Sequence, residues 1–268
     1  MHKENSYSVE SWNSNAIIWD KLMGEGSPFQ KHIVDPCLEK LLPNIGPDTN
    51  ILEIACGNGF LSRRLAQSGA QVWAFDASHE AITLAKGRVQ ANFDKNQSNV
   101  HFFVFDTIDS EGYTHFGVNF DVIICNMAFM DIANLTPIFQ GVSRVLKNNG
   151  VFIVTQTHPC FEKAVGPIFS EAADDQDQDK KINGVKVSRY LSPSVIKTRA
   201  VPELPEEHLF FHRSLSNIFN IAFQAGFIID GFLEAAFPKE GVLKEHSGWH
   251  LLTEVPVIVA VRFRKPRN

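Results

Sequence analysis

The sequence predicts a doubly wound α/β fold built around a mostly parallel sheet. Between residues 50 and 157, short apolar runs alternate with segments whose apolar residues recur at helical spacing. The runs are almost continuously apolar, as expected of strands that are buried on both faces of a parallel sheet. A turn containing two glycines joins the first run directly to the first helical segment, which is the order typical of α/β proteins.

Five strands and three helices follow from this alternation. The strands are predicted over residues 50–55, 71–76, 100–105, 120–125 and 150–155. The helices are predicted over residues 61–66, 81–92 and 135–146. Because a connection between neighbouring parallel strands is almost always a right-handed crossover, this order leaves few topologies for the sheet.

Three segments interrupt the alternation. Residues 8–43 precede the first strand and carry Trp12 and Trp19 in a helical pattern, which predicts helices whose tryptophans serve mainly the core. Residues 158–208 are rich in proline and carry an acidic run over 171–179, so they are predicted to form a lid-like insertion with a solvated loop tip. The remaining chain is predicted to form a helix over 215–225 and strands over 227–233 and 254–263.

Composition excludes several classes of protein. The chain is 44% hydrophobic and 21% charged, which is ordinary for a globular protein and excludes a disordered or fibrous one. The net charge of −5 gives no basic field to hold nucleic acid or an anionic membrane surface. No apolar run approaches the ~18 residues of a membrane span, and the polar start lacks a signal peptide. We therefore expect a cytoplasmic protein with reduced cysteines and a small-molecule partner.

The strongest functional signal is the turn between the first strand and the first helix. It reads Glu-Ile-Ala-Cys-Gly-Asn-Gly from Glu53 to Gly59. Gly57 and Gly59 permit a tight bend that a ligand can approach closely, and the helix behind them offers free N–H groups. Asp76 ends the next strand, where a carboxylate can accept two hydrogen bonds from a ribose. Together these features predict a cofactor that contains adenosine.

The same turn argues against a dinucleotide. The fingerprint G-x-G-x-x-G requires a third glycine at position 62, where this chain has Ser62. Glu53 would repel a pyrophosphate, whereas it suits a ligand that carries an ammonium or a sulfonium group. A nucleotide-dependent oxidoreductase is therefore the weaker alternative.

The turn resembles the first motif of the class I S-adenosylmethionine-dependent methyltransferases, [D/E]-x-[G/A]-x-G-x-G. The resemblance implies that the cofactor is S-adenosyl-L-methionine and that the turn contacts it through Glu53, Ala55, Cys56, Gly57, Asn58 and Gly59. It continues at the ends of the next three strands, where the family places its contacts to ribose, adenine and the methionine ammonium. The matching positions are Asp76, Ala77 and Ser78, then Asp106 and Thr107, and then Asn126, Met127 and Ala128.

The resemblance also implies the rest of the architecture. The expected fold is a Rossmann-like, mostly parallel seven-stranded sheet whose last strand is antiparallel. The whole chain (1–268) is then a single methyltransferase domain, with a helical cap (1–48), a cofactor-binding core (49–157), a lid insertion (158–212) and a C-terminal helix with two strands (213–268).

A catalytic base is expected just beyond the carboxyl ends of the strands, where ligands bind in this architecture. His158 follows the fifth strand and is the first candidate, either as a base or as a hydrogen-bonding group for the acceptor. A purely structural role for His158 is an equally open interpretation. His212 and Arg213 are a second candidate pair, with a structural role favoured for His212. No metal ion is predicted.

The sequence thus predicts methyl transfer to an O, N or C atom of a small, aromatic or hydrophobic molecule. A looser likeness to bacterial family members near the enzymes of quinones and natural products supports this class of acceptor. The main alternative is a protein that binds S-adenosylmethionine without transferring its methyl group, as a cyclase-like catalyst or a sensor. RNA methylation is disfavoured by the net charge. The acceptor and the oligomeric state stay open.

Overall fold

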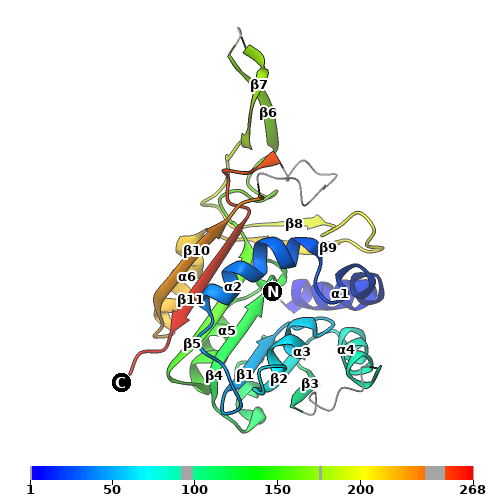
Figure 1. Cartoon of the computed structure of the whole chain (residues 1–268), viewed down its shortest axis with the longest axis vertical. Helices are drawn as coiled ribbons and strands as arrows, with labels where there is room; N and C mark the ends of the chain where they lie inside the picture. Colours follow the sequence, from blue (N-terminus) through cyan, green and yellow to red (C-terminus); the bar gives the residue numbers. More distant parts are fainter. Residues whose placement is uncertain (1, 92–98, 175–176, 239–250, 268) are drawn as a thin grey trace.

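A seven-stranded sheet forms the centre of the computed structural model, which describes residues 2–91, 99–174, 177–238 and 251–267 (Figure 1). Its order is β10-β11-β5-β4-β1-β2-β3. Five strands are parallel, namely β1 (Asn50–Ile54), β2 (Gln71–Asp76), β3 (Val100–Val104), β4 (Phe120–Asn126) and β5 (Leu146–Thr157). The last strand, β11 (Ile258–Arg264), is antiparallel to β5 and to β10 (Ile228–Ala235). The predicted doubly wound, mostly parallel sheet is therefore confirmed.

Helices cover both faces of the sheet because alternate residues of each central strand point to opposite sides. On one face, Ile123 and Cys125 of β4 share an apolar cluster with α5 (Thr136–Val145) and α6 (Leu215–Gln224). On the other face, Val122 and Ile124 share a cluster with α2 (Asp35–Leu41) and α3 (Phe60–Ala66). All four side chains are fully buried, which is why residues 122–125 are continuously apolar in the sequence. The remaining helix of the core, α4 (His79–Ala91), packs beside β2 and β3.

The segment before the sheet is helical, as predicted. It forms α1 (His2–Met23), a short π-helical turn η1 (Gln30–Val34) and α2. Figure 1 shows α1 beside α4, away from α2, which crosses one face of the sheet. Within the described ranges, no helix is both long and apolar enough to cross a membrane.

The insertion after β5 contains more regular structure than the sequence indicates. It forms two antiparallel hairpins, β6 (Ile168–Asp174) with β7 (Asp177–Val185), and β8 (Ser194–Thr198) with β9 (His208–His212). The first hairpin extends away from the body of the molecule (Figure 1). It takes up most of the acidic run, so the prediction of a loop tip over 171–179 is wrong, although residues 175–176 lie outside the described residues.

The first hairpin is hard to detect in the sequence because much of it is exposed. Glu171, Ala172, Lys181 and Ile182 all face solvent. A strand that buries neither face shows no alternation of apolar and polar residues, and this alternation is the signal that identifies strands in a sequence.

Candidate active site

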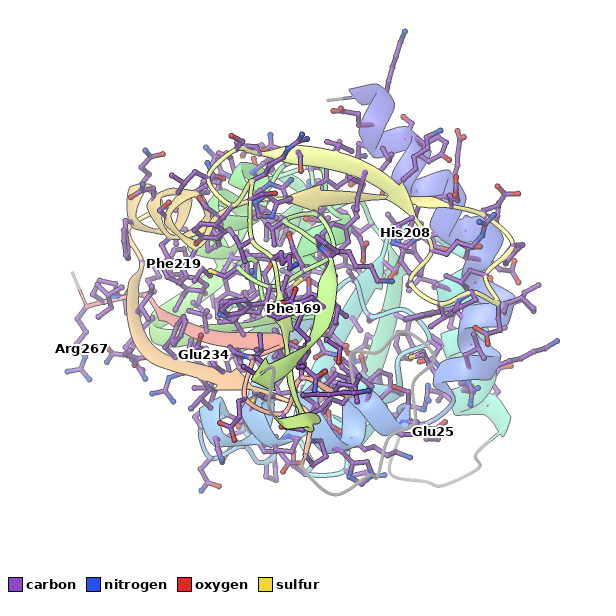
Figure 2. All side chains as sticks on the ribbon, turned by 90° about the horizontal axis from the view of Figure 1, so that it is seen from above. Glu25, Phe169, His208, Phe219, Glu234 and Arg267 are labelled. Atoms are coloured by element: carbon purple, nitrogen blue, oxygen red, sulfur yellow. The ribbon has the colours of Figure 1, made fainter. Side chains whose placement is uncertain are left out.

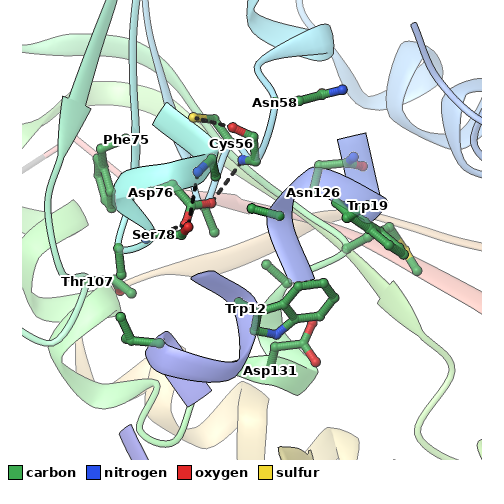
Figure 3. Close-up of a pocket in the computed structure, with 18 of the residues that line it drawn as sticks. Trp12, Trp19, Cys56, Asn58, Phe75, Asp76, Ser78, Thr107, Asn126 and Asp131 are labelled. Carbon is green, nitrogen blue, oxygen red and sulfur yellow. Dashed lines mark hydrogen bonds between the residues drawn. The ribbon is translucent and has the colours of Figure 1, made fainter. Parts of the chain in front are cut away.

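A cavity of about 180 Å³ lies at the carboxyl ends of β1 to β4, under α1 (Figure 3). The strand ends converge there because the carboxyl ends of parallel strands share one edge of the sheet. Every residue that the sequence assigns to the cofactor lines this cavity, except Gly59. The lining residues of this set are Glu53, Ala55, Cys56, Gly57, Asn58, Asp76, Ala77, Ser78, Asp106, Thr107, Asn126, Met127 and Ala128.

The backbone is strained where β1 and β4 meet the cavity. Ala55 has a φ of 55° and Met127 a φ of 54°, which is the left-handed region. Such a conformation costs a residue other than glycine on the order of 1–3 kcal/mol, and it persists where the surrounding structure holds it, often at functional sites. Both residues directly follow strands whose ends line the cavity. The strain therefore points to the same place as the sequence motifs.

The two glycines of the turn, Gly57 and Gly59, have different structural roles. A Cβ added to Gly57 (φ 55°) would meet no atom within 4 Å, so bare main chain borders the cavity there. A Cβ added to Gly59 (φ 71°) would lie 2.5 Å from the ring of Phe102. Gly57 thus keeps the main chain accessible to a ligand, whereas Gly59 is required by packing at the start of α3.

Glu53 is buried, with 2% of its surface exposed. The hydroxyl of Ser62 on α3 donates a hydrogen bond to the Glu53 carboxylate. Burial raises the pKa of Glu53 to about 7, against smaller opposing effects of Ser62 and Arg63. Ser62 therefore binds the Glu53 carboxylate from the position where a dinucleotide fingerprint has its third glycine.

Asp76 and Asp106 each combine a local backbone contact with a place in the cavity wall. Asp76 accepts hydrogen bonds from the backbone N–H groups of Gly57 and Ser78, both at 2.9 Å (Figure 3). Burial raises the pKa of Asp76, and these backbone bonds oppose the shift. Asp106 accepts from the backbone N–H of Ile108 at 3.2 Å. Both carboxylates thus cap a turn through backbone N–H groups and still line the cavity.

The helix α1 covers the cavity and contacts its walls directly. Hydrogen bonds join it to all four strand-end loops, from Asn5 to Asp106 (2.8 Å), from Ser78 to Asn13 (3.0 Å), from Asn58 to Asp20 (2.9 Å) and from Ser8 to the carbonyl oxygen of Asp131 (2.7 Å). Trp12 and Trp19 line the cavity and contact each other edge to face, with ring centres 5.3 Å apart. A helical pattern does not show which apolar face borders a ligand, so the sequence favours the core for these tryptophans and leaves contact with a ligand as the open alternative.

The charge of the cavity is one-sided. Its lining includes four carboxylates, Glu53, Asp76, Asp106 and Asp131, and no Lys, Arg or His among the residues that the structure describes. Such a lining repels phosphates and attracts a positively charged ligand. A nucleoside with a sulfonium and an ammonium group fits these residues, whereas a diphosphate does not.

His158 lies outside the cavity lining, and both of its ring nitrogens are occupied. Nδ1 accepts a hydrogen bond from the backbone N–H of Cys160 at 3.1 Å, so Nε2 carries the proton and donates to Glu234 at 2.7 Å. Burial lowers the pKa of His158, which keeps this ring neutral. The ring therefore has no free lone pair, and this geometry gives no support to a role as base.

Replacing His158 with alanine is expected to lower stability rather than turnover. The variant loses a hydrogen bond to a carboxylate, worth about 1.5–3 kcal/mol of unfolding free energy. Thermal unfolding and rates of S-adenosylhomocysteine release check this expectation. A folded variant with turnover reduced about 100-fold and unchanged cofactor affinity would restore His158 as a base.

His212 and Arg213 also hold structure together. Nδ1 of His212 pairs with Glu162, and Nε2 donates to the carbonyl oxygen of Tyr190 at 2.8 Å. Because both partners accept, both ring nitrogens carry protons, in line with the raised pKa of His212. Arg213 donates to the carbonyl oxygens of Ile132 and Ala133, which fixes the loop after β4.

Two of the polar residues that line the cavity, Asp131 and Gln30, are not part of any motif recognised in the sequence. Asp131 ends the short 3₁₀ turn η4 (Phe129–Asp131), and Gln30 of η1 lines the cavity beside Asn126, with the two amides 3.3 Å apart. The only available signal for Asp131 was its distance of three residues from the motif at 126–128. Gln30 carries no such signal, since its place depends on how η1 packs.

Fold and site together define the class of this protein, the class I S-adenosylmethionine-dependent methyltransferases. A solved structure of such an enzyme from Mesorhizobium loti has a TM-score of 0.64 and 20% identity, covering 85% of this chain and 96% of that one. A family model described as a methyltransferase domain matches residues 45–197. Because this is more than half of the chain, the protein belongs to the methyltransferase-domain family.

Curated relatives match parts of the chain. An uncharacterized methyltransferase of Synechocystis is 35% identical over 42% of this chain and 50% of its own length. A ubiquinone biosynthesis O-methyltransferase of Yersinia enterocolitica is 26% identical over 55% of this chain and 59% of its own length. The chain thus spans less than two thirds of the length of these relatives.

Proposed function

We propose that this protein transfers a methyl group from S-adenosylmethionine to an O, N or C atom of a small, aromatic or hydrophobic molecule. The observation that carries this proposal is a cavity at the edge of the sheet where ligands bind in this fold, lined by four carboxylates and, among the described residues, no cationic side chain. The proposal includes that the whole chain is one methyltransferase domain. It also includes a cytoplasmic setting, with neither nucleic acid nor membrane as partner.

Three of the carboxylates are proposed to hold the cofactor. Asp76 receives the ribose hydroxyls, Asp106 receives the adenine amine in exchange for the Asn5 amide that it now binds, and Glu53 balances the positive charge. Gly57 and the segment 126–128 present backbone to the ligand. When bound, S-adenosylmethionine supplies the methyl group as a sulfonium carbon. The protein's part is to orient both partners, and the tryptophans of α1 exclude water.

An oxygen acceptor has the most support. The relative from Yersinia enterocolitica is named as an O-methyltransferase, and so is a malonyl-[acyl-carrier protein] relative from Magnetococcus marinus. The aromatic lining of the cavity, with Trp12, Trp19, Phe60 and Phe75, suits a flat or hydrophobic molecule.

Calorimetry with four ligands tests the cofactor. S-adenosylmethionine and S-adenosylhomocysteine are expected to bind, and NAD⁺ and ATP to bind at least about 100-fold more weakly, because the described lining offers their phosphates four carboxylates and no Lys, Arg or His. Release of S-adenosylhomocysteine in the presence of acceptors then separates methyl transfer from binding alone. Tight binding of NAD⁺ would contradict the proposal, and cofactor binding without turnover on any acceptor would favour the cyclase-like or sensor alternative.

A further inference from the structure

Three buried polar atoms beside the cavity have no hydrogen-bond partner. They are Nε1 of Trp12, Oδ1 of Asp131 and Nδ1 of His208. Trp12 and Asp131 line the cavity, and His208, only 2% exposed, contacts both. An unpaired buried polar atom costs about 1–3 kcal/mol, so such atoms are rare in native proteins. Two of the three atoms belong to residues that line the cavity, Trp12 and Asp131, so a polar group of a ligand bound there can complete them.

The three side chains come from separate elements that meet at the cavity. The ring of His208, at the start of β9, lies against the indole of Trp12 on α1, with ring centres 4.8 Å apart. Nε2 of His208 is 3.4 Å from Oδ1 of Asp131. From above, His208 lies where the β8–β9 hairpin meets α1 (Figure 2), and Figure 3 shows the indole nitrogen of Trp12 turned toward Asp131.

The position of Asp131 is fixed by the backbone of its loop. The hydroxyl of Ser8 donates to the carbonyl oxygen of Asp131 at 2.7 Å. Arg213 holds the next two carbonyl oxygens, those of Ile132 and Ala133, at 2.6 and 2.7 Å. The main chain is therefore anchored from two sides, and the side chain, 15% exposed, lines the cavity.

Of the four carboxylates in the cavity, Asp131 is the one that the cofactor does not account for. We infer that Asp131 is a catalytic base that removes the proton from a hydroxyl group of the methyl acceptor, with Trp12 as donor to the hydroxyl oxygen. His208, whose Nε2 lies 3.4 Å from Oδ1 of Asp131, is the positioning residue. This inference rests on the proposed methyl transfer and narrows its acceptor to a neutral phenol, enol or alcohol.

A hydroxyl group suits these atoms better than other acceptors do. Its O–H donates to Asp131, and its lone pairs accept from the indole N–H of Trp12. A carboxylate acceptor would bring a second negative charge against Asp131, where the described lining offers no cation. A protonated amine has no lone pair to accept from Trp12.

In the step itself, the O–H bond of the acceptor breaks and its proton passes to the Asp131 carboxylate. A lone pair of the oxygen forms the new bond to the methyl carbon, and the electron pair of the broken C–S bond stays on the sulfur of S-adenosylhomocysteine. The proton on Asp131 returns to water when the products leave. The same hydroxyl group thus loses its proton and gains the methyl group, with no further reactant.

Burial determines the protonation of this pair. It raises the pKa of Asp131 well above the ordinary range of a carboxyl group, and it lowers the pKa of His208 to about 4, with a smaller contribution from Lys163. His208 is therefore neutral near pH 7 and can offer an N–H to Asp131. The other titratable or charged groups near Asp131 are the Cys125 thiol of β4 and Arg213. Since the base acts when deprotonated, turnover is expected to rise with pH.

The test compares three series of probe acceptors built on catechol, benzoate and benzylamine, each with the same apolar substituents. We expect methylation in the catechol series, measured as release of S-adenosylhomocysteine. Asp131→Asn is expected to lower that turnover about 100-fold or more. Calorimetry is expected to show its affinity for S-adenosylmethionine within about twofold of wild type. Asp48→Asn removes an exposed carboxylate outside the lining and is the matched control, expected to change neither quantity.

Two variants of His208 test the positioning role. His208→Phe keeps a ring on Trp12 but removes the N–H, whereas His208→Gln keeps an N–H donor. Without the donor the charged form of Asp131 is less stable, so His208→Phe is expected to shift the acidic limb of the turnover profile to higher pH. His208→Gln is expected to move that limb back, and the exposed His115→Gln serves as control. Equal losses in both variants with an unshifted profile would overturn the positioning role.

The outcomes separate this inference from the proposed function. If wild type fails to bind S-adenosylmethionine, both are overturned. If it binds the cofactor but methylates only benzoates or benzylamines, or no probe of the catechol series, this inference alone is overturned. The same holds if Asp131→Asn retains turnover, or if it loses cofactor affinity in proportion to turnover.

Discussion

Replacing Glu53 with glutamine is expected to weaken the binding of S-adenosylmethionine about 100-fold. The variant keeps the shape of the side chain and its contact with Ser62, but it removes a buried negative charge beside a cationic ligand. A charge-assisted interaction in such a site is worth roughly 2–3 kcal/mol, and each 1.4 kcal/mol is tenfold in affinity. Calorimetry at pH 8, where Glu53 is ionised, measures the difference.

The same substitution is expected to stabilise the ligand-free protein at high pH. The pKa of Glu53 is raised from 4.5 to about 7 in the folded state, so its favourable contribution is complete below pH 4.5 and is lost as pH rises through 7. Full ionisation costs about 3 kcal/mol of unfolding free energy, which glutamine does not lose. Denaturant unfolding is expected to give Glu53→Gln a higher free energy of unfolding, relative to wild type, at pH 8.5 than at pH 5.

A matched control exists in Glu203, an exposed glutamate outside the cavity lining. Glu203→Gln is expected to leave both cofactor affinity and the pH dependence of stability unchanged. If Glu53→Gln binds the cofactor as tightly as wild type, Glu53 does not balance the cationic charge.

The second large effect is expected at Gly59. Gly59→Ala places a Cβ 2.5 Å from Phe102 and 3.3 Å from the Cβ of Ala85, in a left-handed backbone conformation. The conformation costs about 1–2 kcal/mol and overpacking typically adds 1–3, so we expect a loss of about 2–5 kcal/mol of unfolding free energy. Chemical denaturation measures it, and a double variant with Phe102→Ala should recover the overpacking part.

Gly57→Ala is the companion variant. It is expected to lower cofactor affinity more than stability, whereas Gly59→Ala is expected to lower mainly stability. Its Cβ meets no protein atom within 4 Å, so only the backbone cost of about 1–2 kcal/mol is expected. The new methyl group stands where main chain borders the cavity, so cofactor affinity should fall more than stability. Equal losses of stability at both positions would contradict the division of roles between the two glycines.

Much of this fold can be predicted from local patterns in the sequence. Strands such as β4 are buried on both faces, so residues 122–125 are apolar regardless of which face each side chain meets. The strand-end motifs are similarly local, because a carboxylate or glycine directly after such a strand is already placed at the edge of the sheet. That is why Glu53, Asp76 and Asp106 could be assigned to one site from sequence.

Contacts between segments that are distant in the sequence could not be predicted, because no local pattern marks them. His158 does follow β5, but its Nε2 donates to Glu234, which lies 76 residues away on β10, and this bond leaves the ring lone pair on Nδ1, where the backbone N–H of Cys160 occupies it. The group of Trp12, Asp131 and His208 joins three elements, and none of them marks the other two in sequence. The side chains facing the acceptor depend on how α1 and β9 pack, which no local pattern records.

The helix α1 contacts the loops after all four strands that build the cavity. Ser8 reaches the loop after β4, and the other contacts come from Asn5, Asn13 and Asp20. These residues share one 22-residue helix, so any displacement of α1 would change its contacts to all four strand-end loops together.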